Sequence, residues 1–225
     1  MILQLKALSK IYPSSEGVEE VPVFTDLNLN VEKGETVAVL GRSGSGKSTL
    51  LSLIAGLDSP TSGEVKINEH SLGSMNEKSL ARFRVKNIGI IFQQFHLMPH
   101  LTAVENVSLP LELAHDVNAK KKALEVLEQI GLSPRKNHFP YQLSGGECQR
   151  VAIGRALVVE PSILLADEPT GNLDEKTGDQ LSHLLFNLVE SINMTLLLVS
   201  HNKSLANRCS RKLTLQNGKL NDDLV

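Results

Sequence analysis

Residues 41–49, GRSGSGKST, directly follow an apolar run, TVAVL, and fit the spacing G-x-x-x-x-G-K-[ST]. In this spacing the glycines let successive main-chain N–H groups turn toward phosphate oxygens, and the start of the following helix adds partial positive charge. A lysine in this position bridges the β- and γ-phosphates, and the hydroxyl after it binds Mg²⁺. The pattern therefore predicts a phosphate-binding loop with the contact residues Gly41, Ser43, Gly44, Ser45, Gly46, Lys47, Ser48 and Thr49.

Two carboxylates end a second apolar run, ILLADEP, at residues 163–169. A magnesium-dependent triphosphate site needs a carboxylate at the end of a neighbouring strand, and Asp167 is the candidate. Glu168, one residue on, is placed to act as the general base that polarises an attacking water. His201 follows a further apolar run, TLLLVS, so we expect it at the carboxyl edge of the sheet, where open α/β folds place ligands.

Residues 143–150, LSGGECQR, precede an apolar, helix-like stretch. A serine, two glycines and a glutamate in this position are typical of a helix N-terminus that can hold an anion. The chain thus carries a second candidate anion site about a hundred residues after the first one.

These motifs depend on a sheet whose strands are visible in the sequence. Period-two alternation indicates half-exposed strands at residues 3–8 and 23–31, and Asn217-Gly218 between alternating segments indicates a hairpin. Nearly continuous apolar runs, typical of buried parallel strands, lie at residues 36–41, 87–92, 162–167 and 195–200. The fold class predicted is α/β, a P-loop NTPase core with a parallel central sheet, an antiparallel β edge subdomain and a helical insertion subdomain.

The helical insertion lies between Phe95 and Gly146, where strand signals vanish. Residues 117–132 read as an amphipathic helix with Ala123, Val126, Leu127 and Ile130 facing inward. We therefore expect one domain, residues 1–225, with a nucleotide-binding core at about 1–93 and 150–225 and a helical subdomain at about 94–149.

Composition limits the classes of partner. The 225-residue chain has a net charge of -2, so it lacks the basic excess expected of a nucleic-acid binder. The two cysteines have no metal-ligand spacing, and the N-terminus has no signal-peptide pattern. No apolar run approaches the roughly 20 residues that span a bilayer. We expect a cytoplasmic chain that reaches a membrane only through a partner.

The ordered set of motifs resembles the nucleotide-binding domain of an ABC ATPase over nearly the whole chain. The set comprises the phosphate loop, Gln93 after a buried strand, LSGGE, ILLADEP, GNLD at residues 171–174, and His201. In that family two copies pack head to tail, and LSGGE of one copy caps the γ-phosphate of ATP held by the other. The resemblance implies ATPase activity, ATP and Mg²⁺, a homodimer around sandwiched ATP, and nucleotide contacts in trans by Ser144, Gly145, Gly146 and Glu147.

The resemblance also implies roles for single side chains. Tyr12 corresponds to the aromatic residue that stacks on adenine, although its pattern alone fits packing equally well. Gln93 would contact Mg²⁺ and the attacking water, which makes the implied metal ligands Ser48, Gln93 and Asp167. Asp174 would link the two sites across the dimer, and His201 would bond the γ-phosphate. Two residues depart from the usual pattern of the family. Cys148 follows LSGGE in the signature segment, residues 143–148, and Asn202 follows His201.

Within the family, the motifs are most similar to the subgroup for lipoprotein release and macrolide export. This similarity implies an integral membrane permease with few transmembrane helices and a large extracytoplasmic domain, docked near residues 95–107, FHLMPHLTAVENV. The chain would then lie on the inner face of the cell membrane and drive export or extraction. One alternative is an ATP-dependent regulator of an envelope or division assembly. Another is a soluble ABC ATPase acting on ribosomes or DNA, disfavoured by the absence of a basic excess and of long heptad runs.

Overall fold

The computed structural model describes residues 1–13 and 20–222 of the chain. Its main-chain contacts divide it into two compact units, Met1–Ala81 with Met194–Val225, and Arg82–Asn193.

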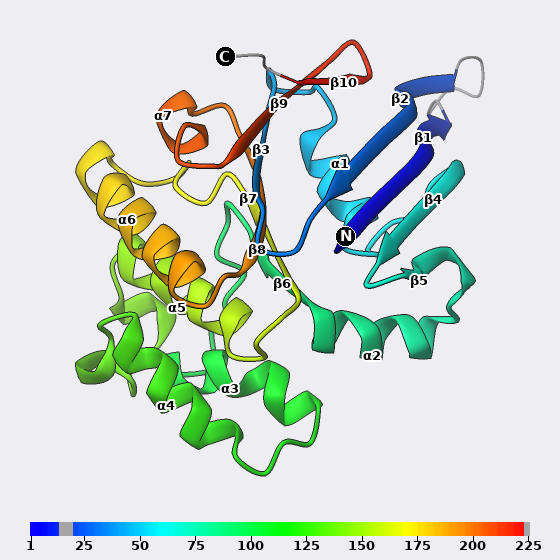
Figure 1. Cartoon of the computed structure of the whole chain (residues 1–225). Helices are drawn as coiled ribbons and strands as arrows, with labels where there is room; N and C mark the ends of the chain where they lie inside the picture. Colours follow the sequence, from blue (N-terminus) through cyan, green and yellow to red (C-terminus); the bar gives the residue numbers. More distant parts are fainter. Residues whose placement is uncertain (14–19, 223–225) are drawn as a thin grey trace. The chain divides into compact units, whose positions relative to one another are not determined.

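The first unit contains an antiparallel sheet with the strand order β2-β1-β4-β5. In Figure 1 its first three strands lie side by side in blue and cyan. Leu5 pairs with Leu29 on one side and with Val65 on the other, and all three side chains are buried. The alternation in the sequence thus places one face of this sheet in the core. The strands are β1 (Leu3–Pro13), β2 (Glu20–Val31), β4 (Ser62–Ile67) and β5 (His70–Ser71).

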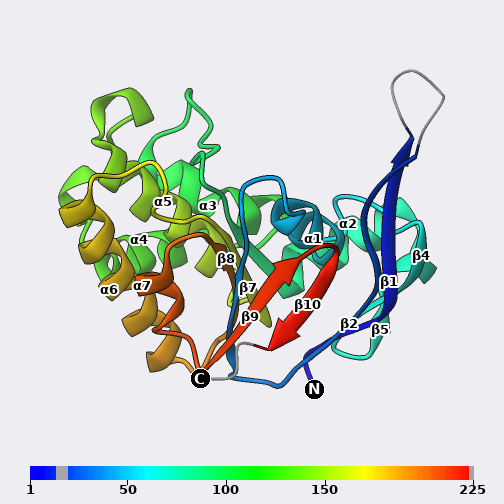
Figure 2. The same ribbon diagram turned by 90° about the horizontal axis from the view of Figure 1, so that it is seen from above.

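The same unit contains strands in the order β10-β9-β3-β8. Strand β3 pairs in parallel with β8 and with β9, and β9 turns into β10 through Asn217 and Gly218, both at positive φ. This is the hairpin that the Asn-Gly pair predicts, and Figure 2 shows its two strands in red. The elements are β3 (Thr36–Leu40), α1 (Lys47–Ile54), β8 (Thr195–Ser200), α7 (Lys203–Ala206), β9 (Arg211–Gln216) and β10 (Lys219–Asp222).

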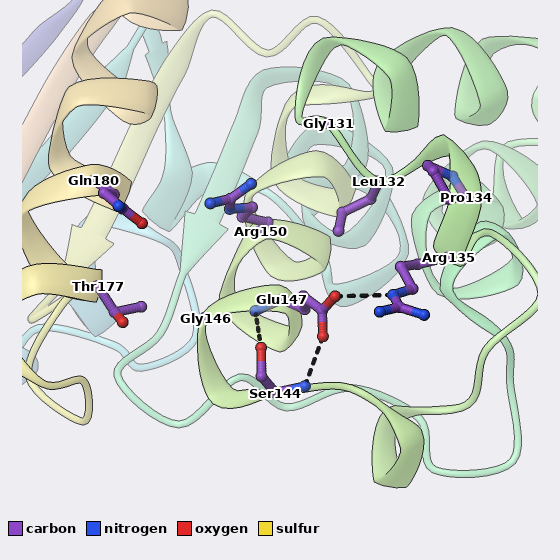
Figure 3. Close-up of a pocket in the computed structure, with 10 residues that line it drawn as sticks. All are labelled: Gly131, Leu132, Pro134, Arg135, Ser144, Gly146, Glu147, Arg150, Thr177 and Gln180. Carbon is purple, nitrogen blue, oxygen red and sulfur yellow. Dashed lines mark hydrogen bonds and ion pairs between the residues drawn. The ribbon is translucent and has the colours of Figure 1, made fainter.

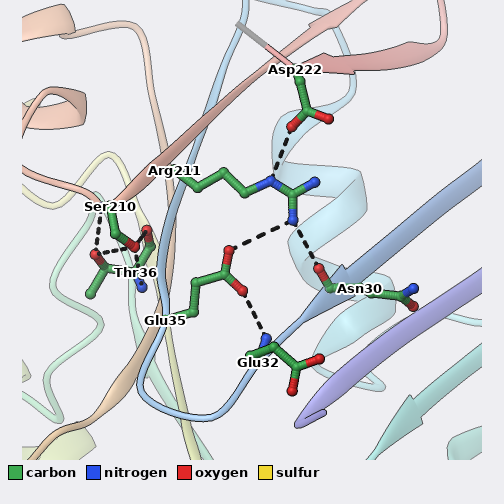
Figure 4. Close-up of polar contacts among 7 residues, drawn as sticks. All are labelled: Asn30, Glu32, Glu35, Thr36, Ser210, Arg211 and Asp222. Carbon is green, nitrogen blue, oxygen red and sulfur yellow. Dashed lines mark hydrogen bonds and ion pairs between the residues drawn. The ribbon is translucent and has the colours of Figure 1, made fainter. Parts of the chain in front are cut away.

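A polar network ties the turn after β2 to the C-terminal hairpin (Figure 4). Arg211 of β9 donates from Nε to the Asp222 carboxylate, 3.0 Å, and from Nη1 to the Asn30 carbonyl, 3.0 Å. The Glu35 carboxylate lies 3.6 Å from the same Nη1 and also accepts from the main-chain N–H of Glu32. Hydrogen bonding to Asp222 raises the pKa of Arg211. The network therefore joins β2 and the turn after it to a hairpin that lies about 180 residues later in the chain, within the first unit.

A polar connection leads from the first unit into the second. It consists of a 3₁₀ turn (Leu72–Ser74) and helix α2 (Glu77–Asn87). None of the α2 side chains is buried, so the helix lacks the apolar stripe by which sequence reasoning finds helices.

The second unit has two parallel strands and a helical region. Ile88 pairs with Ile163 and Ile91 with Ala166. Helices α3 and α4 pack on each other and on α5, and their shared core contains the predicted inward residues Ala123, Leu127 and Ile130, with Val126 partly buried against it. The elements are β6 (Ile88–Ile91), α3 (Ala103–Leu113), α4 (Ala119–Gln129), α5 (Gly145–Leu157), β7 (Ile163–Asp167), α6 (Glu175–Ser191) and 3₁₀ turns at Ser133–Arg135 and Pro140–Gln142.

The architecture is the predicted one: an α/β protein with parallel strands, an antiparallel sheet and a helical region. In the portion of the chain that the structure describes, no helix has both the length and the apolarity that crossing a membrane requires.

Candidate nucleotide-binding site

The predicted phosphate loop lies between β3, which ends at Leu40, and α1, which begins at Lys47. Gly44 and Gly46 have φ values of 77° and 97°, a left-handed conformation that strains any other residue. A Cβ at Gly46 would also lie 2.5 Å from Cγ1 of Val23. Glycine is therefore required at the point where the loop turns into the helix.

Lys47 lies inside this loop, with only 8% of its surface exposed. Its Nζ donates to the carbonyls of Gly41, 2.8 Å, and Arg42, 2.9 Å. Within residues 1–13 and 20–222, the buried Oγ of Ser45 has no hydrogen-bond partner. A buried cation and an unpaired hydroxyl in a turn of main-chain N–H groups fit an anionic ligand such as a phosphate group.

A hollow of about 890 Å³ opens beside the loop. It is lined by residues of the loop from Gly41 to Ser45, by His201, and by the turn at Asn217 and Gly218. The structure thus brings His201 to the same hollow as the phosphate loop, as its place after an apolar strand predicts. Ser43 and Ser48 are exposed, and Thr49 is half-buried on the first turn of α1.

Asn202, which departs from the usual pattern, has a structural role in α7. Its side chain accepts hydrogen bonds from the main-chain N–H groups of Ser204, 2.9 Å, and Leu205, 3.2 Å. An aspartate would accept the same two bonds, because asparagine and aspartate are about equally good N-caps. The departure therefore leaves the local geometry after His201 intact.

Tyr12 lies near the end of β1, held by an ion pair. Its hydroxyl donates to Oδ2 of Asp58, 2.7 Å, and Nζ of Lys10 lies 4.5 Å from its ring centroid. Lys10 is nearly buried and donates to Oδ1 of Asp58, 2.8 Å, and to the carbonyl of Ser59, 2.8 Å. The hydrogen bond to Asp58 raises the pKa of Tyr12, whereas one with Thr49 opposes the rise. Tyr12 keeps 39% of its surface exposed, so its position is fixed while part of the side chain stays accessible.

The carboxylate pair of the second unit lies at the end of β7. Asp167 is the last residue of the strand, and Glu168 has a φ of 45°, in the left-handed region. A non-glycine residue there costs free energy and persists only where its surroundings hold it. The main-chain N–H of Gly171 donates to the Glu168 carbonyl, 2.9 Å, and the Gln149 side chain donates to the Pro169 carbonyl, 2.8 Å.

Gln93 follows β6 and forms a reciprocal pair with Asn172 of the GNLD segment. Nε2 of Gln93 donates to Oδ1 of Asn172, 3.2 Å, and Nδ2 of Asn172 donates to the Gln93 carbonyl, 2.9 Å. Asp174 begins α6 as its N-cap and accepts from the Thr177 N–H, 3.0 Å. A hydrogen bond from the Thr177 side chain holds the pKa of Asp174 below its usual range. In this structure Asp174 therefore has a local capping role.

The signature residues form a complete capping box at the start of α5 (Figure 3). Oγ of Ser144 accepts from the Glu147 N–H, 3.2 Å, and the Ser144 N–H donates to the Glu147 carboxylate, 2.8 Å. This main-chain bond is the largest cause that holds the pKa of Glu147 below its usual range. A Cβ at Gly146 would lie 2.6 Å from Cγ2 of Thr177, so any larger residue there would displace the Thr177 side chain.

A hollow of about 570 Å³ lies beside this capping box. Figure 3 shows Arg135 reaching the Glu147 carboxylate, an ion pair of 3.0 Å. The polar side chains that line the hollow and were not singled out from the sequence are Arg135, Arg150, Thr177 and Gln180. Arg135 lies 12 residues before Glu147, in a segment without a periodic sequence pattern, so its ion pair with Glu147 is visible only in the folded chain. Gly145 has room for a Cβ, with Cδ2 of Leu173 3.5 Å away.

The described residues offer few clustered donors for a metal ion. Across the described ranges, no group of three or more His, Cys, Asp or Glu side chains gathers in a way that could hold a metal ion. Mg²⁺ commonly binds one or two protein oxygens together with substrate phosphates and waters. Ser48 of the first unit has an exposed hydroxyl and Asp167 of the second a half-buried carboxylate, and each by itself is an oxygen donor of the type that this ion prefers.

Comparison with known proteins agrees with this geometry. The model of the ABC transporter family matches residues 24–171. The chain is 48% identical over 210 residues to the ABC transporter ATP-binding protein YbbA of Escherichia coli strain K12, covering 92% of each chain. It is 47% identical over 220 residues to the lipoprotein-releasing system ATP-binding protein LolD of Psychrobacter arcticus, covering 96% of each.

A solved structure is similar over the full length. It is the dimeric, post-hydrolysis state of the ATP-binding cassette MJ0796 bound to ADP and Pi, with a TM-score of 0.90 at 41% identity, covering 99% of this chain and 98% of that one. The similarity confirms the predicted P-loop NTPase core, and the LolD relatives match the lipoprotein-release subgroup that the motifs indicate. The chain therefore belongs to the ABC transporter family, as an ATP-binding subunit with ATPase activity.

Proposed function

We propose that this subunit dimerises on ATP and drives a membrane partner for the export or extraction of a substrate. The observation that carries the proposal is that one chain presents two separate anion-binding features. The first unit carries the loop around Lys47. The second carries the start of α5, where Ser144 is the N-cap and the first two residues are glycines. A similar cassette, MJ0796, is dimeric with ADP and Pi, which supports two chains sharing each nucleotide.

In the proposed ATP site, the phosphate loop binds the triphosphate. Lys47 leaves the carbonyls of Gly41 and Arg42 and donates to the β- and γ-phosphates, and Ser45 donates its unpaired hydroxyl. Tyr12 stacks on the adenine, and His201 hydrogen-bonds the γ-phosphate. The remaining loop contacts come from main-chain N–H groups and the hydroxyls of Ser43 and Thr49.

The proposed magnesium ligands are Ser48, Gln93 and Asp167. When bound, Mg²⁺ neutralises charge that develops on the phosphate oxygens. The Ser48 hydroxyl and the Asp167 carboxylate supply hard oxygen donors, which this ion prefers.

For hydrolysis we propose Glu168 as the general base and Gln93 as the residue that orients the attacking water. The main chain at Glu168 is in the left-handed region, with a φ of 45°, and such strain is common at residues that act on a substrate. Gln93 donates from Nε2 to Asn172, which leaves its Oε1 to accept from a water or bind the metal.

In the proposed dimer, the signature of one chain caps the γ-phosphate bound by the other. Gly145 and Gly146 would offer their main-chain N–H groups, and Ser144 its hydroxyl, at the start of α5. Glu147 carries a negative charge toward this anion site, and Arg135 balances that charge through their ion pair. Asp174 at the start of α6 links the two sites. The nucleotide-binding core would comprise about residues 1–93 and 150–225, and the helical subdomain about 94–149.

The proposed partner is an integral membrane permease with few transmembrane helices and a large extracytoplasmic domain. The relatives that are lipoprotein-releasing system ATP-binding proteins support this kind of partner. The permease would dock near residues 95–107 and hold the subunit on the inner face of the cell membrane.

Two variants test the chemistry. A general base contributes about 10² to 10⁴ in rate, so Glu168→Gln should nearly abolish hydrolysis but keep ATP binding and accumulate a closed dimer in size-exclusion chromatography with ATP. Lys47→Ala should instead weaken ATP binding itself. Hydrolysis at the wild-type rate by Glu168→Gln, or unchanged ATP affinity of Lys47→Ala, would contradict the assignment.

A pull-down tests the partner. Tagged Glu168→Gln protein is recovered with ATP from membranes in mild detergent and analysed by mass spectrometry. Recovery of a membrane protein with few transmembrane helices and a large extracytoplasmic domain supports the proposal. Recovery of division or envelope proteins without a permease would favour regulation, and recovery of ribosomal proteins or DNA-binding proteins would refute the membrane role.

A further inference from the structure

The buried side chain of Gln149, on the second turn of α5, bridges two loops of the second unit. Its Nε2 donates to the Pro169 carbonyl, 2.8 Å, and to the Phe92 carbonyl, 3.3 Å. These two carbonyls belong to the neighbours of Glu168 and Gln93. The residue is fully buried, so water does not compete for these bonds.

The hydrogen-bond partners of the Gln149 amide determine its orientation, and this orientation costs free energy. Because both neighbours are carbonyl oxygens, the nitrogen must face them. Among the residues that the structure describes, Oε1 of Gln149 is then a buried acceptor without a hydrogen-bond partner. An unsatisfied buried acceptor is unfavourable, and an apolar side chain of equal length would avoid it. The donor end is therefore the part of Gln149 that the fold uses.

The hydrogen bonds from Gln149 lie next to a strained residue of the main chain, Glu168. Glu168 has a φ of 45°, and its own carbonyl accepts from Gly171. The bond from Gln149 to Pro169 holds the following peptide group, so hydrogen bonds restrain two consecutive carbonyls, those of Glu168 and Pro169. On the other loop, Arg155 of the same helix donates to the carbonyls of Phe95, 2.9 Å, and His96, 2.5 Å. Helix α5 thus contacts the main chain on both sides of Gln93.

From these contacts we propose that Gln149 is a positioning residue for ATP hydrolysis, because its amide sets the separation between the main chain that carries Gln93 and the main chain that carries Glu168. This inference rests on the roles proposed above for Gln93 and Glu168. A general base and a water-orienting residue must meet the same water molecule, and a misplacement of about 1 Å can cost on the order of 100-fold in rate.

The test is Gln149→Met in the full chain, which keeps the length of the side chain and removes the donor. The expected result is a kcat for ATP hydrolysis about 10- to 100-fold lower, with the Kd for ATP within about twofold of wild type. Hydrogen–deuterium exchange should become faster in peptides that cover residues 88–97 and 164–173. A wild-type kcat, or a parallel loss of kcat and ATP affinity, would overturn the inference.

Ser108→Ala is the matched control. Ser108 is also buried in the second unit, and its hydroxyl hydrogen-bonds the Glu105 carbonyl, 3.2 Å, and the Glu112 carboxylate, 2.6 Å, away from both loops. This variant should keep the wild-type kcat. An equal loss of kcat in Ser108→Ala would show that Gln149→Met reports general loosening of the unit, and would refute the positioning role.

A second variant, Gln149→Asn, and the hydrolysis rate of Glu168→Gln distinguish failure of the positioning role from failure of the proposed function. Gln149→Asn is one methylene shorter and should lose the same two bonds, so it replaces the methionine variant if that one fails to fold. Failure of both variants to fold would assign Gln149 to the fold as a whole and overturn the inference. If Glu168→Gln keeps hydrolysis, the proposed function fails; if Glu168→Gln loses hydrolysis and Gln149→Met keeps it, only the positioning role fails.

Discussion

Asp58→Ala removes the carboxylate at the centre of the Lys10–Asp58–Tyr12 cluster. The change leaves Lys10, a residue only 8% exposed, without its ion-pair partner, and it leaves the Tyr12 hydroxyl without its acceptor. Removing one partner of a buried ion pair costs about 3–5 kcal/mol. Here the carboxylate is 30% exposed and Lys10 keeps the Ser59 carbonyl, so we expect a loss of about 2–3 kcal/mol.

The assay is urea and thermal unfolding followed by circular dichroism. For a chain of 150–250 residues, about 1 kcal/mol shifts the Tm by about 2–4 °C, so Asp58→Ala should lower it by about 5–10 °C. Lys121→Ala is the control, because Lys121 and Glu125 form an exposed pair 4.0 Å apart. Removing such a pair changes the stability by less than about 1 kcal/mol.

A double variant isolates the cause of the loss. Adding Lys10→Met to Asp58→Ala removes the unpaired ammonium, so the double variant should be more stable than Asp58→Ala alone. The reasoning is refuted if Asp58→Ala loses less than about 1 kcal/mol, or if the double variant is less stable than the single one.

Further predictions concern the N-cap of α5, a glycine of the antiparallel sheet, the reactivity of a buried thiol and the dependence of stability on pH. Ser144→Ala removes the N-cap of α5 and should cost about 1 kcal/mol in urea unfolding, whereas Ser144→Asp should cost less. Gly63→Ala should destabilise by more than about 1 kcal/mol in the same assay, because φ is 86° and a Cβ would lie 2.3 Å from the Ala7 carbonyl oxygen. Burial raises the pKa of Cys209 to about 12, so its thiol should react with a thiol reagent at pH 8 only when the protein is unfolded. Folding lowers the pKa of Glu147. The contribution of its carboxylate to stability is therefore complete above the unfolded-state pKa and is lost as the pH falls through the folded-state pKa. Between pH 7 and pH 3, the urea midpoint should accordingly fall less in Glu147→Gln than in wild type.

Sequence reasoning succeeded where the structure depends on neighbours along the chain. The phosphate loop must follow a strand and precede a helix, and the structure places β3 and α1 there. The Asn-Gly hairpin and the inward face of α4 are likewise local patterns. The first strand was underpredicted: β1 continues to Pro13 and includes Tyr12, because irregular pairing lets the strand extend past residue 8.

The contacts that hold the candidate site join residues far apart in the sequence. Asp58 meets Tyr12 across 46 residues, Gln149 reaches Phe92 across 57, and Gln93 pairs with Asn172 across 79. Only the strand order brings these positions together, and no periodicity marks them. Helix α2 was missed for a different reason, since it buries no side chain and so shows no apolar stripe.

The bonds from Lys47 to its own loop imply a particular thermodynamic character for nucleotide binding. The Lys47 ammonium is buried against two carbonyls of the loop, so contacts within the chain themselves hold the curved shape of the loop. ATP binding is then an exchange of hydrogen-bond partners without a folding step, so its heat-capacity change should be small for a ligand of this size. Release of the product would likewise leave the loop ready, and no reordering would separate one turnover from the next.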